Sequence, residues 1–215
     1  MKKIVSFVFS LVIATFSASA GCQHANSTIS SGDEPVINGH EYVDLGLPSG
    51  LKWATCNVGA SKPEEYGNHY AWGEISTKSN YSSDNSVTYG KKFSDIGGNP
   101  TYDVARKQWG STWRLPTKAE FEELRQNCTW TWTIQNGIKG YKVTSKKNGN
   151  SIFLPAAGWR NGTSLYGQGT YGFYWSSTPH ESYSYYAYSL YFISGYHYTY
   201  WYYRNYGQSV RPVSE

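Results

Sequence analysis

The chain carries little charge and little cysteine, and its basic residues are dispersed. Of its 215 residues only 16% are charged and three are cysteine, and no run of Lys or Arg after residue 20 is longer than two. Without Lys2 and Lys3, which belong to the N-terminal signal described next, the 19 basic residues become 17 against 15 acidic ones. Nucleic-acid binding needs a basic stripe that neutralises phosphates. We therefore expect no nucleic-acid partner.

The chain also lacks an apolar run long enough for a membrane-spanning helix. Residues 4–16 form an apolar run of about 13 residues, against the roughly 20 that a stable transmembrane helix needs. Lys2 and Lys3 precede this run, and Ala18-Ser19-Ala20 supplies the small-x-small pattern of a signal-peptidase site after it. The pattern predicts that residues 1–21 are an export signal, which is removed and takes no part in the fold.

Two cleavage positions lead to two locations. Cleavage after Ala20 gives a secreted protein, whereas cleavage after Gly21 leaves Cys22 at the new N-terminus. Small residues before such a cysteine resemble a bacterial lipobox, although Ser19 stands where that motif usually has Leu. We expect a cell-envelope protein: a surface-exposed outer-membrane lipoprotein, held to the membrane by an N-terminal lipid anchor if Cys22 is modified, and a secreted protein otherwise.

A flexible tether is predicted at residues 22–38. Residues 23–34 are polar, rich in Ser and Asn, and contain no aromatic side chain. Such a stretch cannot bury enough apolar area to offset the entropy lost when it is ordered. Residues 39–215 then have the length of a single domain with a full core, because no linker or fixed-period repeat divides them.

The local patterns within this domain predict an α+β fold with two helices, short antiparallel strands and long loops. The clearest helix begins after Thr117, which forms a capping box with Glu120, and places Phe121, Leu124 and Cys128 on one face. A shorter helix is expected near residues 103–109. Strands are expected at residues 42–45 and 51–54, and residues 141–144 and 152–154 are expected to form a hairpin. Residues 76–100 show neither the helical nor the strand period of apolar residues. We therefore expect a long loop there, which in a compact domain is often functional.

The tyrosines are concentrated near the C-terminus, where 13 of the 21 lie between Tyr171 and Tyr206. Each buried hydroxyl left without a partner would cost about 1–3 kcal/mol. Most of these rings are therefore expected at a surface, where Tyr provides rigid contact area, as it does beside Ser, Gly and Asn in antibody binding loops. Residues 196–203 alternate Tyr with other side chains, which is typical of a strand with two faces. The alternative that stays open is a structural aromatic sheet, in which the tyrosines only pack against one another across the strands. The side chains expected in the core of this region are Trp175, Ala187, Leu190, Phe192, Val210 and Pro212.

Six ordered motifs resemble one known family and cover nearly the whole mature chain. They are Trp53-Ala54-Thr55-Cys56-Asn57-Val58-Gly59, Tyr70-Ala71-Trp72-Gly73-Glu74, Trp113-Arg114-Leu115-Pro116-Thr117, Phe153-Leu154-Pro155-Ala156-Ala157-Gly158, Tyr174-Trp175-Ser176-Ser177 and Gly207-Gln208-Ser209-Val210-Arg211-Pro212-Val213. The series resembles the Fibrobacter succinogenes major paralogous domain family, which is abundant among exported lipoproteins of gut Bacteroidetes. The resemblance implies a C-type-lectin-like fold related to the formylglycine-generating enzyme branch.

Some members of that family are similar to the variable proteins of diversity-generating retroelements, whose C-terminal segment is rewritten at adenines and displayed for ligand binding. The resemblance implies that residues 39–215 are a C-type-lectin-like binding domain for a protein or glycan ligand on another cell or host surface. Trp201 lies in the same run and is added to the ligand-binding candidates, although adenine changes alone cannot produce it from an Asn codon. The residues that the resemblance would display are Tyr183, Tyr185, Tyr186, Tyr188, Tyr196, Tyr198, Tyr200, Tyr202, Tyr203, Asn205 and Tyr206.

The signatures of an enzyme are missing, so we expect none. The related enzyme branch uses cysteines late in the chain, and no cysteine follows Cys128. There is no G-x-S-x-G elbow, and the histidines have neither HxH nor HExxH spacing. A glycosidase pair among the glutamates stays open, because such a pair is defined by its separation in space.

No metal or other cofactor is expected either. Calcium-dependent lectins supply oxygen ligands from the motifs Glu-Pro-Asn, Gln-Pro-Asp and Trp-Asn-Asp, and none of these is present. The alternative function is therefore a metal-independent glycan-binding module. The second alternative is a structural envelope protein. If Cys22 is lipidated, Cys56 and Cys128 remain as an even pair. In an oxidising envelope they could form a disulfide worth about 4 kcal/mol in the chain-entropy model, or remain two buried thiols.

Overall fold

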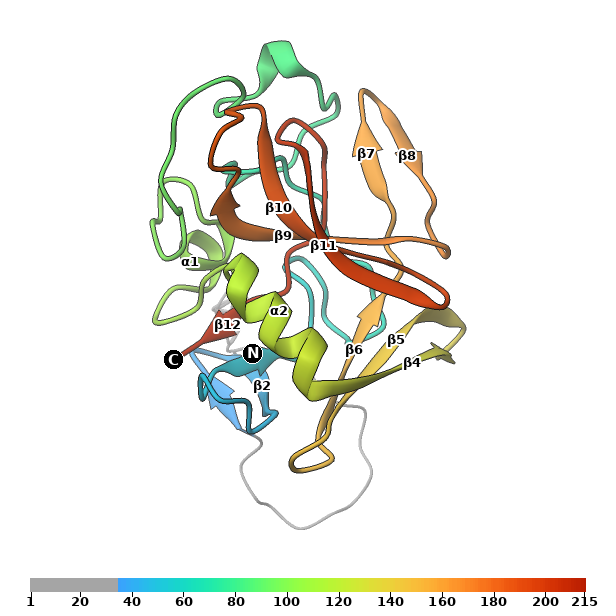
Figure 1. Ribbon diagram of the computed structural model, residues 1–215. Helices are drawn as coiled ribbons and strands as arrows, with labels where there is room; N and C mark the ends of the chain where they lie inside the picture. The colour runs from blue at the N-terminus through green and yellow to red at the C-terminus, as the bar shows by residue number, and fades with distance from the viewer. Residues whose placement is uncertain (1–34) are drawn as a thin grey trace, which may run out of the picture.

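A computed structural model describes residues 35–215 (Figure 1). The predicted signal peptide, the lipidation of Cys22 and most of the predicted tether lie outside the described residues. The described chain folds into four small antiparallel sheets and two α-helices, so the predicted α+β class is confirmed. No helix within residues 35–215 has the length and apolar character needed to cross a membrane.

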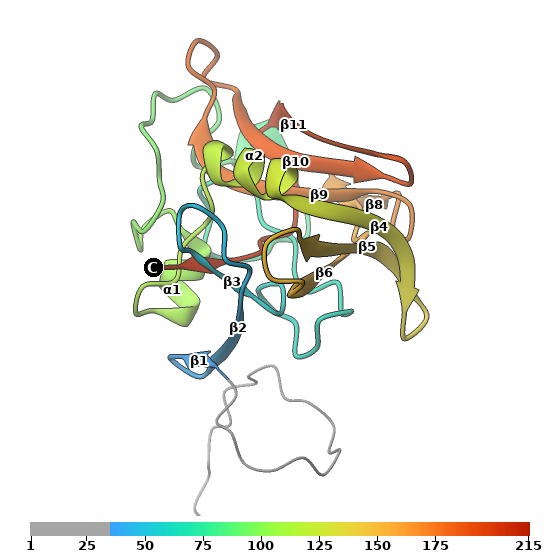
Figure 2. The ribbon, with the colours of Figure 1, turned by 60° about the horizontal axis from the view of Figure 1, so that its bottom comes forward.

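The two ends of the domain meet in one sheet, which lies below β9–β11 in both views (Figures 1 and 2). Its strands, in spatial order, are β1 (Val36–Ile37), β2 (His40–Asp44), β3 (Lys52–Ala54) and β12 (Val213–Ser214). The domain begins earlier than residue 39, because Asn38 and Gly39 have φ of 48° and 80° and turn β1 back onto β2. Asn-Gly is a strong signal for such a tight hairpin.

Both predicted helices are present. α1 (Val104–Trp109) begins at Asp103, whose carboxylate accepts from the N–H groups of Ala105 and Arg106. α2 (Lys118–Asn127) begins at Thr117, and both halves of the predicted capping box with Glu120 are formed. A single-turn 3-10 helix, Ser83–Asn85, lies within the predicted long loop.

A second sheet follows α2 without a break. Its strands β4 (Cys128–Gln135), β5 (Ile138–Ser145) and β6 (Ser151–Pro155) pair antiparallel in that order. The hairpin of β5 and β6 was predicted, whereas β4 was not. A second Asn-Gly turn at residues 136–137, with φ of 47° and 83°, joins β4 to β5. The short hairpin of β7 (Trp159–Asn161) and β8 (Ser164–Tyr166) comes next.

The tyrosine-rich segment forms the third sheet. Its strands are β9 (Gly172–Pro179), β10 (Tyr186–Ile193) and β11 (Tyr196–Tyr203), with β10 in the middle and β11 at an edge. α2 packs against all three strands (Figure 2). The six side chains that we expected to be structural in this region are all buried, so that prediction is confirmed.

Cys56 and Cys128 are not bonded to each other, which decides an alternative that the sequence left open. Cys128 is a free thiol, buried in the core cluster that also holds Phe121 and Leu124 of α2. Cys56 belongs to a separate small cluster with Ala60. Of the two alternatives that the sequence left open, the Cys56–Cys128 disulfide is therefore excluded, because the Cys128 thiol is free and the two side chains belong to different clusters. Burial raises the pKa of the Cys128 thiol to about 11, which keeps it protonated and unreactive.

Candidate ligand-binding surface

The two faces of β11 have different surroundings, as the alternation of its sequence predicts. The odd-numbered side chains on the first half of the strand turn toward α2 and β4. His197 stacks on Trp130 with ring centroids 4.4 Å apart, and its backbone oxygen accepts from Arg125 at 2.8 Å. Thr199 donates a hydrogen bond to Glu122. These contacts fix which face of the strand points outward.

The even-numbered tyrosines of β11 lie on the opposite face and form a ladder across the sheet. Tyr198 is paired with Tyr191 of β10, which is paired in turn with Phe173 of β9, and both ring pairs have centroids 4.9 Å apart. Tyr200 and Tyr202 face the small residues Ser189 and Ala187 on β10, so their rings lie beside one another with centroids 5.9 Å apart. We call this set the ladder face: Phe173, Tyr191, Tyr198, Tyr200 and Tyr202.

A second group of tyrosines gathers at the end of β11, and its rings meet around Tyr203. The ring of Tyr203 lies 4.6 Å from that of Tyr186 and 5.6 Å from that of Tyr206. Tyr89, from the long loop, lies 6.2 Å from Tyr203 and 5.0 Å from Tyr185. We call this set the phenol cluster: Tyr89, Tyr185, Tyr186, Tyr203 and Tyr206.

Trp201 joins the two groups around the free edge of the sheet. Its ring stacks on Tyr200 of the ladder face at 4.8 Å and lies 4.4 Å from Tyr186 of the phenol cluster. The ladder face, Trp201 and the phenol cluster therefore form one continuous aromatic band. No side chain of the band carries a charge at neutral pH, since all of its members are Tyr, Phe or Trp.

A buried arginine holds the long loop in place at the end of the band. The guanidinium of Arg204 donates to the backbone oxygens of Thr88 and Lys91 at 3.2 and 2.8 Å, and to that of Tyr186 at 3.0 Å. It also lies 4.3 Å from the centre of the Trp72 ring. Burial lowers the pKa of Arg204 to about 10, so it remains a cation at neutral pH. Tyr89 is thereby held next to Tyr203.

Three phenols of the cluster, Tyr89, Tyr186 and Tyr206, have a raised pKa. A hydrogen bond with Tyr203, followed by burial, raises the pKa of Tyr186 to about 12. Burial is the first cause of the raised pKa of Tyr89 and of Tyr206, and the neighbouring phenol of Tyr203 adds to both. Each hydroxyl can therefore both donate and accept a hydrogen bond. The band is therefore suited to uncharged contacts.

The predicted surface position of the tyrosines is confirmed for most of the set. Of the 13 tyrosines between Tyr171 and Tyr206, only Tyr174 and Tyr188 are buried. Among the predicted ligand-binding residues, Tyr186, Trp201, Tyr202 and Tyr206 are half-buried. The exposed ones are Tyr183, Tyr185, Tyr196, Tyr198, Tyr200 and Tyr203.

Two residues of the predicted set are largely covered by the protein, and their partners explain why. Tyr188 is 9% exposed: Lys118 lies 3.8 Å over its ring, and its hydroxyl donates to Glu181 at 2.9 Å. Asn205 is 7% exposed, because its amide donates to the backbone oxygen of Tyr81 at 3.2 Å. The sequence pattern also missed Tyr89, Phe173 and Tyr191, which only the strand pairing and the loop position bring into the band.

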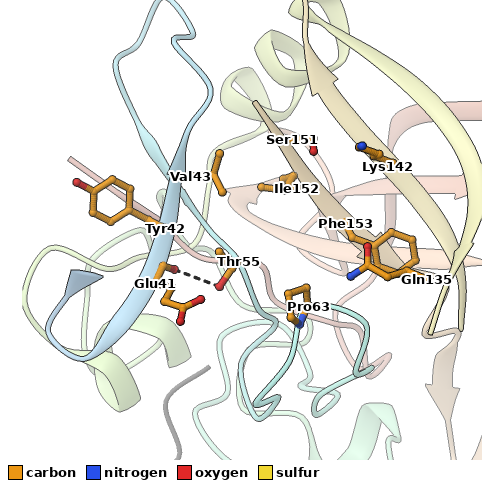
Figure 3. A pocket seen from close by; sticks show the side chains of 10 residues that line it. All are labelled: Glu41, Tyr42, Val43, Thr55, Pro63, Gln135, Lys142, Ser151, Ile152 and Phe153. Atoms are coloured by element: carbon orange, nitrogen blue, oxygen red, sulfur yellow. Dashed lines mark hydrogen bonds between the residues drawn. The ribbon is translucent and has the colours of Figure 1, made fainter. Parts of the chain in front are cut away.

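A cavity of about 360 Å³ lies elsewhere, between β2 and the β5–β6 pair (Figure 3). Glu41 and Lys142 come from opposite walls, and Thr55, Gln135 and Phe153 also line it. None of the predicted ligand-binding residues takes part. The lining combines one acid, one base and several apolar side chains, so it does not single out a ligand class. Within residues 35–215, no three side chains of His, Cys, Asp or Glu gather as a metal site.

The fold and the surface together define a β-rich α+β domain that carries a continuous aromatic band. Residues 138–213, which run from β5 into β12 and include all of β9–β11, match the model of a family described as a domain of unknown function (DUF8237). No curated protein and no solved structure matches the chain.

Proposed function

We propose that the protein is a non-catalytic exported ligand-binding protein, of the adhesin or receptor kind. It captures a protein or glycan on another cell or host surface through the aromatic band. The observation that carries this proposal is the unbroken series of ring contacts from Phe173 to Tyr89, in which no tyrosine is fully buried and four are exposed. Monomeric proteins seldom expose a large apolar patch without a binding role.

Capture would work by burying rings that are already in place. The ladder rings support one another, and α2 fixes the strand beneath them through Arg125 and Glu122. Little side-chain entropy is then lost on binding, which is the advantage of a preorganised surface. The phenol hydroxyls would be satisfied by polar groups of the ligand, and no covalent step is needed.

The finer assignment of the fold is also a proposal. The six ordered motifs support membership of the Fibrobacter succinogenes major paralogous domain family and a C-type-lectin-like architecture. They also support diversification of the C-terminal segment by a retroelement. A reverse transcriptase gene beside a near-copy of the 3′ end that differs at adenines would establish this diversification, and a neighbourhood without one would refute it.

The proposed location is the cell envelope. Lipidation of Cys22 would place the domain on the outer-membrane surface behind a polar tether, and cleavage after Ala20 would release it instead. Both outcomes expose the aromatic band to an extracellular ligand.

The test compares binding before and after removal of two exposed rings. The purified domain is applied to a glycan array and to a panel of extracellular proteins, and the probe with the highest signal is measured in solution. We expect Tyr198→Ala/Tyr200→Ala to lose this binding and Tyr42→Ala, which removes a ring from β2, to keep it. Equal loss in both variants, or in neither, would contradict the proposal and favour a purely structural role for the ladder.

A second candidate function is a metal-independent glycan-binding module. It is favoured by one specific feature, a pocket at the end of the band that is lined by phenols, hydroxyls and amides without a charged side chain.

A further inference from the structure

A pocket of about 300 Å³ opens at the end of the aromatic band. It lies where three segments far apart in the sequence meet: the long loop near Tyr81, the turn between β7 and β8, and the chain just after β11. Tyr89, Tyr203 and Tyr206 of the phenol cluster form part of its wall. The pocket and the aromatic band are therefore continuous.

Backbone hydrogen bonds build this pocket before any ligand arrives. Tyr81 and Gly162 exchange two of them, at 2.8 and 3.0 Å, which joins the long loop to the β7–β8 turn. Arg160 and Gly207 exchange another two, at 2.8 and 2.9 Å, which joins β7 to the segment after β11. Gly207 allows this close approach, since a Cβ there would lie 2.6 Å from the Tyr81 ring.

The wall also contains an acceptor that nothing in the described chain uses. The amide nitrogen of Asn205 donates to the backbone oxygen of Tyr81 at 3.2 Å, and this bond fixes which way the amide is turned. The amide oxygen accepts no hydrogen bond from any of residues 35–215, and it is not fully enclosed by protein atoms. Because Asn205 is more than nine-tenths buried and lines the pocket, this oxygen is available to a ligand donor there.

The chemistry of the wall restricts what can bind. No Lys or Arg lines the pocket to hold an anion, and no Asp or Glu lines it to hold a cation. Phenol hydroxyls, Ser82, Ser83 and Asn161 supply both donors and acceptors. An entirely apolar guest would leave many of them unpaired. The ligand should therefore be neutral, rich in hydroxyl groups, and have a C–H face that can lie against an aromatic ring.

From this geometry we propose that the pocket receives one neutral pyranose unit, the terminal sugar of a glycan that continues along the aromatic band. The proposal rests on the proposed ligand-binding function and deepens it by naming the ligand class. The sugar hydroxyls donate to the Asn205 oxygen and bond the surrounding hydroxyl and amide groups. A C–H face of the ring lies against one of the phenols. A protein ligand would need only the band.

The experiment uses the methyl glycosides of glucose, galactose, mannose and N-acetylglucosamine as probes, with methyl glucuronide as the charged comparison. Saturation-transfer difference NMR on the exported domain measures their binding. Asn161→Trp places a large side chain in the wall. Asn161 is exposed and its own side chain makes no hydrogen bond within residues 35–215, so the substitution breaks no side-chain hydrogen bond there. Asn161→Ala removes the amide alone, and thermal unfolding verifies that both variants are folded.

We expect at least one neutral glycoside to give a signal that falls by fivefold or more in Asn161→Trp and less in Asn161→Ala, with no signal from the glucuronide. The same signal should persist in Tyr42→Ala, because that ring lies on β2, outside the aromatic band and the pocket. Absence of binding by every neutral glycoside, or binding that Asn161→Trp leaves unchanged, would overturn the inference. If array binding still depends on Tyr198 and Tyr200 in that case, the proposed function stands and only the sugar pocket is wrong.

Discussion

Removing Tyr198 and Tyr200 together tests the aromatic band most directly. Their rings are 36% and 44% exposed, and neither lies in the core. A fully buried tyrosine covers roughly 200 Å², so the two rings together leave on the order of 160 Å² for a ligand to cover. At about 25 cal/mol per Å², covering this area contributes about 4 kcal/mol. We therefore expect Tyr198→Ala/Tyr200→Ala to weaken binding by about 100- to 1000-fold.

The same double substitution should cost the fold much less. It removes ring contacts with Tyr191, Trp201 and Tyr202 at centroid distances of 4.8 to 5.9 Å. Aromatic pairs on a surface contribute about 0.5–1.5 kcal/mol each. The contributions of neighbouring pairs do not add in full, because the same rings take part in several of them. We expect a loss of about 1–2 kcal/mol, which lowers the Tm by roughly 2–8 °C in a domain of this length.

The assay pairs a binding measurement with a melting curve on the same samples. Biolayer interferometry with the strongest array probe gives the affinity, and circular dichroism gives the Tm. Tyr42→Ala is the control, because it removes a half-buried ring from β2, which belongs to a different sheet from β11 and lies below it in both views (Figures 1 and 2). A double variant that remains folded and binds within threefold of the wild type would refute the reasoning. Collapse of the fold would show instead that the rings are structural.

Three further predictions concern stability and location. Tyr202→Ala should lower the free energy of unfolding by about 3 kcal/mol, because the Tyr202 ring packs against the buried Phe173 ring with centroids 5.0 Å apart. Tyr202→Phe keeps the ring and should cost less than about 1 kcal/mol. Equal losses in a urea titration would show that the hydroxyl rather than the ring matters. Burial lowers the pKa of His69 to about 4 from 6.5, so the unfolded chain binds a proton over a pH range in which the folded protein does not. Stability should therefore fall by about 3 kcal/mol as the pH drops from 7 to 4, and His69→Gln should flatten this dependence; an unchanged slope would contradict the assignment. Cys22→Ser should move the exported protein from the detergent phase to the aqueous phase in Triton X-114 partitioning, and an aqueous wild-type protein would argue for free secretion.

The local signals in the sequence were reliable where neighbouring residues decide the structure. The capping box of Thr117 and Glu120 fixed the start of α2, because both of its hydrogen bonds are made within one turn. The hairpin of β5 and β6 and the loop at residues 76–100 were also found. β4 was missed because Cys128 continues the apolar spacing of α2, although the chain there changes from helix to strand.

Errors arose where partners come from distant segments. Nothing near Cys128 indicates that Cys56 lies in a different cluster. Tyr188 and Asn205 have the same local pattern as the exposed residues, and only their contacts with Lys118, Glu181 and Tyr81 show that they are largely covered. The exposure of a side chain depends on which segments cover it, and the residues next to it in the sequence do not determine those segments.

By itself, the sequence determined that many phenols gather near the C-terminus and that most must reach solvent, since an interior could not pair so many hydroxyls. The alternation of β11 also gave that strand two faces. Only the tertiary structure decided which face is open, because α2 and β4 cover one side through Arg125, Glu122 and Trp130. It also placed Tyr89 beside Tyr203 and closed a pocket there. The contacts of Tyr89 with Tyr203 and of Arg204 with Thr88 join residues more than 100 positions apart, and the geometry of such contacts exists only once the chain has folded.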